Sequence, residues 1–202
     1  MRDDDAARVG RCRGKSYLDL LRQRAGDCED APDAVVAPAD AREAQQVIYA
    51  CSEEGVAVVP FGGGTSVVGG LEPLRGRFGA LISLDLGRMA GLLSFDERSR
   101  TAWLGAGTRL PEADHALAQR GYTLGHTPQS YEWATVGGCV ATRSAGQSSA
   151  GRGRIEDNVV ALRCATPAGE LATLAAPATA AGPSVKELVV GSEGTLLSLI
   201  HI

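Results

Sequence analysis

Apolar and polar residues follow two periods along this chain, and together they predict short strands and short helices. Apolar runs bounded by proline, glycine or charged residues predict strands over residues 34–36, 56–60, 81–86 and 99–104. Apolar residues at helical spacing predict helices over residues 16–25, 40–55 and 111–121. A β-hairpin is predicted from residues 158–165 and 170–174, with its turn at 167–169. The pattern indicates an α+β fold.

Signals for the ends of the helices support these predictions. Asp40 followed by Glu43 is a capping-box start, and Gly55 supplies the stop of the same helix. Pro111 stands in the first turn of the next helix. Because strand, helix and strand follow one another over residues 34–60, this part is predicted to be a βαβ crossover unit.

The composition is that of an ordinary globular protein. The chain has 202 residues, 44% of them hydrophobic, which is enough to bury a core. A formal net charge of -4 gives no electrostatic basis for binding nucleic acid, and no apolar run is long enough to span a bilayer. The charged start lacks the apolar segment of a secretory signal, so we expect a cytoplasmic protein. The five cysteines form no CxxC pair, so we expect reduced thiols and no metal site.

The most informative stretch for chemistry is residues 56–70, VAVVPFGGGTSVVGG, in which an apolar run leads into three glycines. The glycines can take positive φ and present successive backbone N–H groups to an anion, while Thr65 and Ser66 add hydroxyl donors. One interpretation is a buried strand that leads into a phosphate-binding loop. The other is a tight turn after a strand, which is the commoner case for three glycines taken alone.

Two familiar phosphate loops do not match this stretch. A Walker loop needs lysine followed by serine or threonine after its last glycine, and the nearest lysines are Lys15 and Lys186. A dinucleotide fingerprint needs glycine at its sixth position, and counted from Gly62 that position is Val67. The stretch therefore belongs to neither of these loop types.

Residues 126–157 form a second unusual region, rich in glycine and small hydroxyl residues and poor in large aliphatic ones. Such a segment is either a flexible surface loop or a backbone that lies against a flat ligand. Together with the first glycine loop, the second interpretation is the more economical. One loop would bind phosphates while the other lines the rings, which predicts a flavin dinucleotide as the ligand.

Three segments resemble, in order and spacing, the PCMH-type FAD-binding domain of the vanillyl-alcohol-oxidase superfamily. They are VVPFGGGTSVVGG, TPQSYEWATVGGCVATRSAGQSSAGRGRIEDNVV and VGSEGTL. Within the superfamily the similarity is greatest to bacterial relatives of alkyldihydroxyacetonephosphate synthase. The resemblance implies an α+β fold of two subdomains with FAD between them, in an FAD-dependent oxidoreductase or a synthase-like enzyme.

The resemblance also implies which residues bind FAD. It assigns the pyrophosphate to the first glycine loop, the flavin and ribityl chain to two later segments, and the last contact to the VGSEGTL motif. Members with covalent flavin carry histidine where this chain has Thr65, so non-covalent FAD is implied. The implied residues are Pro60, Phe61, Gly62, Gly63, Gly64, Thr65, Ser66, Gln129, Ser130, Tyr131, Glu132, Trp133, Ala134, Thr135, Thr142, Arg143, Ser144, Ala145, Glu193, Gly194, Thr195 and Leu196.

Domain boundaries follow from the same resemblance. Residues 1–30 are expected to be an N-terminal helical extension, and residues 31–202 the FAD-binding domain, divided into subdomains 31–90 and 91–202. Relatives continue after the SEGTL motif into a substrate-binding cap, whereas residues 197–202 read LSLIHI and look foreign. We therefore expect a truncated chain that leaves an apolar sheet edge exposed, is poorly stable and is inactive alone. The small-molecule substrate site and the catalytic residues are expected in the missing cap, and full-length relatives are expected to be homodimers.

Three functions remain open from the sequence. The first is an FAD-dependent enzyme domain, which would either exchange an acyl group for a fatty alcohol on dihydroxyacetone phosphate or oxidise a 2-hydroxy acid such as lactate or glycolate. The second is a catalytically inert flavin-binding module. The third is an α+β interaction domain whose glycines only form turns.

Other candidate side chains have structural interpretations. His126 is expected to serve packing or a backbone hydrogen bond rather than the flavin. Glu156 and Asp157, read as neighbours in a strand, would point to opposite faces and are expected to cap or pair locally. Trp103 and Trp133 are expected to be core and loop anchors.

Overall fold

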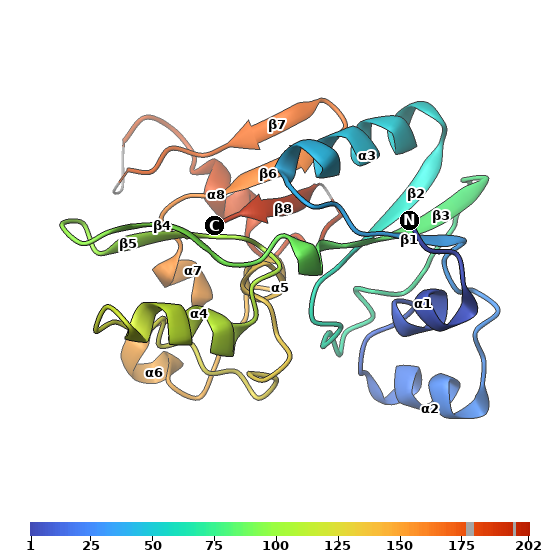
Figure 1. Cartoon of the computed structure of the whole chain (residues 1–202), viewed down its shortest axis with the longest axis horizontal. Helices are drawn as coiled ribbons and strands as arrows, with labels where there is room; N and C mark the ends of the chain where they lie inside the picture. The colour runs from blue at the N-terminus through green and yellow to red at the C-terminus, as the bar shows by residue number, and fades with distance from the viewer. Residues whose placement is uncertain (177–179, 196) are drawn as a thin grey trace.

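The computed structural model describes residues 1–176, 180–195 and 197–202, and its strands form three small sheets surrounded by short helices (Figure 1). The α+β prediction is confirmed. Along the chain the elements are α1 (Asp5–Gly10), α2 (Tyr17–Ala25), β1 (Ala34–Val36), α3 (Ala41–Glu53), β2 (Val56–Phe61), β3 (Ala80–Asp85), η1 (Leu86–Arg88), β4 (Leu92–Asp96), β5 (Thr101–Leu104), α4 (Leu110–Ala118), α5 (Val136–Ala141), α6 (Ser149–Arg152), α7 (Ile155–Asn158), β6 (Arg163–Thr166), β7 (Gly169–Ala172), α8 (Val185–Val189) and β8 (Ser198–His201).

The first sheet is parallel and has the strand order β1-β3-β2. The predicted crossover from β1 through α3 to β2 is present, with β3 lying between the two strands. The expectation that β2 is buried was wrong, because β2 is an edge strand in which Phe61 alone is buried. Pro60 accounts for this position, since proline has no N–H to donate and is tolerated at a sheet edge.

Helix α3 packs between the first sheet and the sheet formed by β7, β6 and β8. Its N-cap is Asp40, whose side chain accepts a hydrogen bond of 2.9 Å from the Glu43 N–H. The Glu43 carboxylate bonds Ala39 N–H rather than the N-cap N–H, so the predicted capping box is shifted by one residue. The helix ends before Gly55, which has a φ of 63°. Because α3 packs on both β2 and β6, it fixes the glycine loop after β2 relative to the rest of the molecule (Figure 1).

Two antiparallel units complete the strands. The predicted hairpin of β6 and β7 is confirmed, and β8 pairs with the other edge of β6. Strand β5 was predicted within residues 99–104, but its partner β4 was missed. Leu93 and Ser94 are both exposed, so β4 lacks the regular alternation that identifies a strand in a sequence. Helix α4 begins at Leu110 with Pro111 in its first turn, as predicted.

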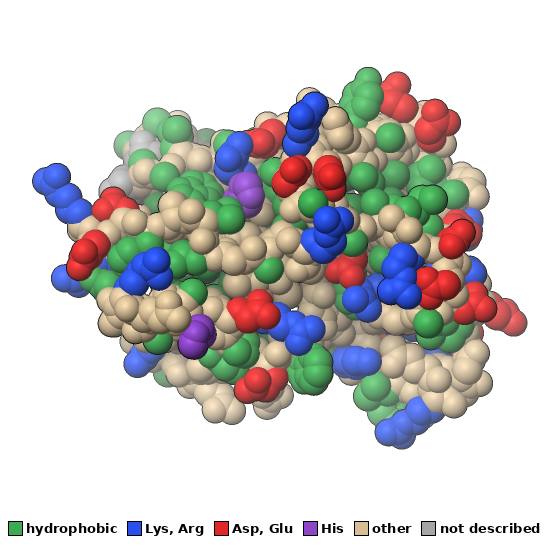
Figure 2. Space-filling view, viewed as in Figure 1, with side chains coloured by type: hydrophobic (Ala, Val, Ile, Leu, Met, Phe, Trp, Pro, Cys, Tyr) green, Lys and Arg blue, Asp and Glu red, His purple; other side chains and the backbone are tan. Residues whose placement is uncertain are grey.

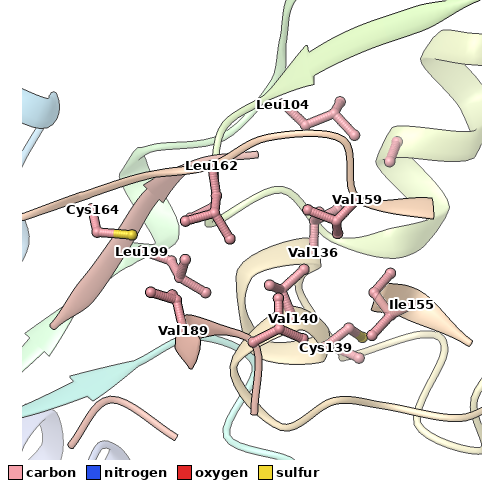
Figure 3. Close-up of a cluster of buried hydrophobic side chains, with 14 of the residues drawn as sticks. Leu104, Val136, Cys139, Val140, Ile155, Val159, Leu162, Cys164, Val189 and Leu199 are labelled. Atoms are coloured by element: carbon pink, nitrogen blue, oxygen red, sulfur yellow. The ribbon is translucent and has the colours of Figure 1, made fainter. Parts of the chain in front are cut away.

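Residues 126–157 contribute to the hydrophobic core. The sequence had suggested either a flexible surface loop or a backbone that lies against a ligand, and neither interpretation included a role in the core. Side chains of α5 and α7 point into a buried cluster with side chains of β6 and β8 (Figure 3). Val140 and Ile155 are almost fully buried there. Small residues make this close packing possible, because a Cβ on Gly137 would lie 2.7 Å from the Ala106 Cβ.

The last residues of the chain fill the core instead of leaving it open. Leu197, Leu199 and Ile200 are all buried, and β8 hydrogen-bonds to β6. On its other side, Ile200 and Ile202 accept backbone hydrogen bonds of 3.1 and 2.7 Å from Ala106 and Leu104. The structure thus differs from the expected exposed apolar edge, while the foreign origin of residues 197–202 stays a prediction.

The N-terminal residues pack against the first sheet, where α1 lies beside β1 (Figure 1). Arg2 bridges to Val35 of β1 through two backbone hydrogen bonds. The side chain of Arg13 is buried and donates to the Asp30 carboxylate. A separate buried cluster contains Leu84 and Ile200, from the two predicted subdomains. The domain division therefore stays a prediction.

Candidate functional site

A cavity of about 330 Å³ follows the glycine loop, which we define as residues 62–66. Side chains and backbone from five separate parts of the chain line it, although they are far apart in the sequence. Its lining residues are Pro60, Phe61, Gly62, Gly63, Gly64, Thr65, Ser66, Val67, Val68, Gly70, Leu71, Leu86, Ala106, Ser130, Ala134, Thr135, Gly137, Gly138, Cys139, Ala141, Thr142, Ser144, Ser192, Glu193, Gly194, Leu197, Ser198 and Leu199.

The glycine loop packs directly against the segment that begins α5. A Cβ on Gly62 would lie 2.5 Å from the Thr135 hydroxyl, and a Cβ on Gly63 would overlap the backbone carbonyl of Trp133. Gly64 has a φ of 67°, which favours glycine. The glycines are therefore required by contact between two loops as well as by the shape of the cavity.

Hydrogen-bond donors in the glycine loop are left without protein partners. The backbone N–H groups of Gly63, Gly64, Thr65 and Ser66 donate no hydrogen bond within the part of the chain that the structure describes. The hydroxyl oxygens of Ser66 and Ser198 are buried, line the cavity and also lack a partner among the described residues. Buried polar groups are nearly always hydrogen-bonded, so the two buried hydroxyls indicate a missing partner. Together with the neighbouring N–H groups they fit an anionic ligand such as a pyrophosphate.

Only part of the second predicted segment reaches the cavity. Ser130, Ala134 and Thr135 line it, and the Thr135 hydroxyl also caps α5 by accepting the Gly138 N–H at 3.1 Å. The other predicted members, Gln129, Tyr131, Glu132 and Trp133, do not line it.

Two of these outlying side chains have other partners. The Tyr131 hydroxyl donates to the Asp114 carboxylate at 2.7 Å, and burial together with this bond raises the pKa of Tyr131 to about 12. Trp133, which was expected to be an anchor, is 60% exposed and has the Arg109 guanidinium over its ring. Trp103 is half-buried in β5 rather than a core residue.

The third predicted segment is divided in the same way. Thr142 and Ser144 line the cavity, whereas Arg143 and Ala145 do not. Arg143 has a φ of 51° and turns its guanidinium toward the carbonyl of Val190, at 2.9 Å. Its role in the structure is thus to hold the end of α8 beside α5.

The predicted last contact also lies at the cavity. Glu193 and Gly194 line it, and Thr195 does not. Both lining residues have positive φ, and a Cβ on Gly194 would lie 3.0 Å from the ring of Pro60. Leu196 lies outside the described residues.

A buried histidine lies behind the cavity wall. His126 Nε2 is 3.0 Å from the hydroxyl of Ser144, and burial lowers the pKa of His126. The same wall contains Cys139, whose pKa burial raises to about 11. His126 itself does not line the cavity, so its expected structural role agrees with its contacts.

Glu156 and Asp157 have local roles, as predicted, but within helix α7 rather than a strand. Asp157 accepts the Arg154 N–H at 2.8 Å, and Glu156 is 3.9 Å from Arg143. All five cysteines are free thiols.

Several cavity residues were missed from the sequence. Gly137 and Gly138 stand in the TVGG segment, where the absence of large side chains was the available signal. Others, including Leu86, Ala106 and Leu199, are ordinary apolar residues of distant elements. Only the tertiary fold brings them to the cavity, so no local pattern could have identified them.

The described residues contain no group of three or more His, Cys, Asp or Glu side chains that could hold a metal ion. On the face seen in Figure 2, acidic and basic side chains are interspersed without a continuous basic area. Within the described residues, no helix has the length and apolar character needed to cross a membrane.

Comparisons with known proteins agree with this geometry. A family model described as FAD binding domain matches residues 32–175. Alkyldihydroxyacetonephosphate synthase of Dictyostelium discoideum is 39% identical over 97% of this chain, which corresponds to 32% of the synthase. Glycolate oxidase subunit GlcD of Bacillus subtilis is 31% identical over 83% of the chain, or 35% of that protein.

A solved structure of an alkyldihydroxyacetonephosphate synthase superposes with a TM-score of 0.91 and 36% identity, over 99% of this chain and 37% of the synthase. The chain thus spans about a third of the length of these relatives. The predicted fold and the predicted cofactor, FAD, are both confirmed by these similarities. The chain belongs to the FAD binding domain family.

Proposed function

We propose that the cavity holds FAD without a covalent bond, with the pyrophosphate against the glycine loop. The observation that carries the proposal is the row of four N–H groups, from Gly63 to Ser66, that have no hydrogen-bond partner among the described residues. The buried Ser66 hydroxyl adds one more donor at the same place. A phosphate anion accepts several hydrogen bonds at once, so it would satisfy all of these donors together.

The rest of the cavity suits the remainder of the cofactor. In this proposal the flavin and ribityl chain lie along cavity-lining residues of the two later segments, and residues 193–194 make the last contact. When bound, FAD supplies a ring that accepts or returns electrons. The chain's own part is to bind this ring, orient it and exclude water with apolar side chains such as Leu86 and Leu199. Thr65 offers no imidazole for a covalent bond.

For the whole protein we propose a small-molecule substrate held against the flavin by a cap domain, in a homodimer. The sequence identity of 39% with alkyldihydroxyacetonephosphate synthase of Dictyostelium discoideum supports a synthase-like exchange of groups without net redox change. The similarity to a glycolate oxidase subunit supports the alternative, oxidation of a 2-hydroxy acid. Five free thiols suit a reducing compartment, which supports a cytoplasmic location. The division at residues 30 and 90 belongs to the same proposal.

The test uses two buried serines whose hydroxyls both lack a hydrogen-bond partner in the part of the chain that the structure describes. Ser66 lines the cavity, and Ser83, in β3, does not. FAD is titrated into the flavin-free 202-residue chain while flavin fluorescence is followed. We expect saturable binding of FAD, binding at least tenfold weaker for FMN, which lacks the pyrophosphate, and a several-fold weaker FAD affinity for Ser66→Ala. Ser83→Ala is expected to bind as the parent does.

Two results would contradict the proposal. One is a folded parent protein, verified by circular dichroism, that binds no FAD. The other is equal FAD affinity of Ser66→Ala, Ser83→Ala and the parent, which would remove the glycine loop from the binding site.

A further inference from the structure

The segment between α1 and α2 is buried although it has no regular secondary structure. We call residues 11–15 the N-terminal strap. Cys12, Arg13 and Gly14 are buried in it. The match to the FAD binding domain family begins at residue 32, so the strap lies outside the part of the chain to which FAD binding is assigned.

One end of the strap contacts the last residue of the glycine loop. The backbone N–H of Lys15 donates to the carbonyl oxygen of Ser66 at 2.7 Å. A Cβ on Gly14 would overlap that oxygen and lie 3.1 Å from the Ser66 carbonyl carbon. These are backbone atoms, which cannot rotate away as the end of a side chain can. Glycine at position 14 is therefore required for the strap to approach the loop this closely.

The other end of the strap contacts the residue before the loop. Arg11 Nε is 2.6 Å from the carboxylate of Asp85, and the Arg11 guanidinium lies 5.2 Å from the centre of the Phe61 ring. That ring in turn lies beneath Gly64, since a Cβ there would be 2.6 Å from its Cζ atom. The strap thus contacts both ends of the glycine loop, through Phe61 and through Ser66.

We propose that the N-terminal strap positions the glycine loop for the FAD pyrophosphate, so that FAD affinity depends on residues outside the family domain. A loop fixed at both ends loses its conformational freedom when the protein folds. Such a loop loses less conformational entropy when FAD binds, so the affinity for FAD is higher. This inference rests on the proposed function, because it takes the glycine loop to be the phosphate site.

The test separates the backbone of the strap from its side chains. Lys15→Pro removes the N–H that bonds Ser66, whereas Lys15→Ala keeps it and changes only an exposed side chain. We expect Lys15→Pro to weaken FAD binding roughly three- to tenfold, the effect of losing one hydrogen bond, and Lys15→Ala to stay within about twofold of the parent. FAD affinity is measured by flavin fluorescence, and Tm is measured without FAD.

A second pair of variants tests the close approach at Gly14. Gly14→Ala is expected to weaken FAD binding more than tenfold, because the loop must move to admit the methyl group. Gly10→Ala is the matched control, since a Cβ there meets no atom within 4 Å. The visible circular dichroism of bound FAD should change in Gly14→Ala and remain that of the parent in Gly10→Ala, a difference that a loss of stability alone would not produce.

The outcomes distinguish the two proposals. Parent protein that binds FAD, together with folded Lys15→Pro and Gly14→Ala proteins of unchanged affinity, would overturn the strap while leaving the proposed function intact. A folded parent that binds no FAD would overturn both. If Gly14→Ala does not fold, the comparison of Lys15→Pro with Lys15→Ala decides alone.

Discussion

A methyl group on Gly63 tests the contact between the two loops that form the cavity. The added Cβ would overlap the backbone oxygen of Trp133, and would lie 2.9 Å from the carbonyl carbon of Trp133 and 3.1 Å from the Cα atom of Ala134. All three neighbours belong to the backbone. The methyl group can therefore be admitted only if residues 133–134 or the glycine loop move, and this strain is present whether or not FAD is bound.

Overpacking of this kind costs about 1–3 kcal/mol. For a domain of this size, 1 kcal/mol lowers Tm by about 2–4 °C, so Gly63→Ala is expected to lower the Tm of the flavin-free protein by about 2–12 °C. The displaced loop should also bind FAD roughly 5- to 150-fold more weakly, if a similar free energy is lost on binding. Tm is measured by circular dichroism, and FAD affinity by flavin fluorescence.

Gly79→Ala is the matched control, because a Cβ at that position meets no atom within 4 Å. It should keep the Tm and FAD affinity of the parent. A Gly63→Ala protein with an unchanged Tm would refute the contact between the loops. A lowered Tm with unchanged FAD affinity would refute the assignment of the glycine loop to the cofactor.

The remaining predictions concern the flavin linkage, a buried histidine, a buried thiol and the last strand. Acid precipitation should release all FAD from the protein, since Thr65 replaces the histidine of covalent relatives, and a yellow washed pellet would refute this. Burial lowers the pKa of His126 from its ordinary value of 6.5, so the unfolded chain takes up a proton at this residue at a higher pH than the folded protein does. The free energy of unfolding therefore decreases as the pH falls below 6.5. The Tm of His126→Gln should therefore fall less on acidification than that of the parent or of His115→Gln, and equal slopes would contradict the burial. Burial raises the pKa of Cys139 to about 11, so iodoacetamide at about pH 8 should leave it unlabelled in peptide mass spectra until the protein unfolds. Ile200→Ala, which truncates a side chain only 1% exposed, should cost about 2–5 kcal/mol in urea unfolding, and a cost below about 1 kcal/mol would contradict the packing of β8.

The elements with strong local signals could be predicted from the sequence. Helix α3 has a capping aspartate and a stop glycine, and the hairpin of β6 and β7 has a Pro-Ala-Gly turn, so both were found. Strand β4 was missed because its side chains do not alternate between buried and exposed positions. The edge position of β2 was missed because an apolar run looks the same in an edge strand as in a central one, and Pro60 was the available warning.

Cavity residues that contribute backbone N–H groups could be predicted from the sequence. Residues whose contribution depends on the direction of the side chain were predicted less well. The glycine loop was found because three glycines and two hydroxyl residues are visible in the sequence. In contrast, Tyr131 and Arg143 belong to segments that line the cavity, but their side chains turn toward Asp114 and Val190. Their partners are far away in the sequence, so only the folded structure defines these directions.

A crystal structure of the 202-residue chain with FAD bound would show directly whether the glycine loop holds the pyrophosphate. We expect the pyrophosphate to lie within hydrogen-bond distance of the backbone N–H groups from Gly63 to Ser66, with no covalent bond between FAD and the protein. We also expect the Ser66 hydroxyl, which has no partner among the described residues, to donate to a phosphate oxygen. Density for the pyrophosphate elsewhere, with the glycine loop making no contact to FAD, would contradict this expectation.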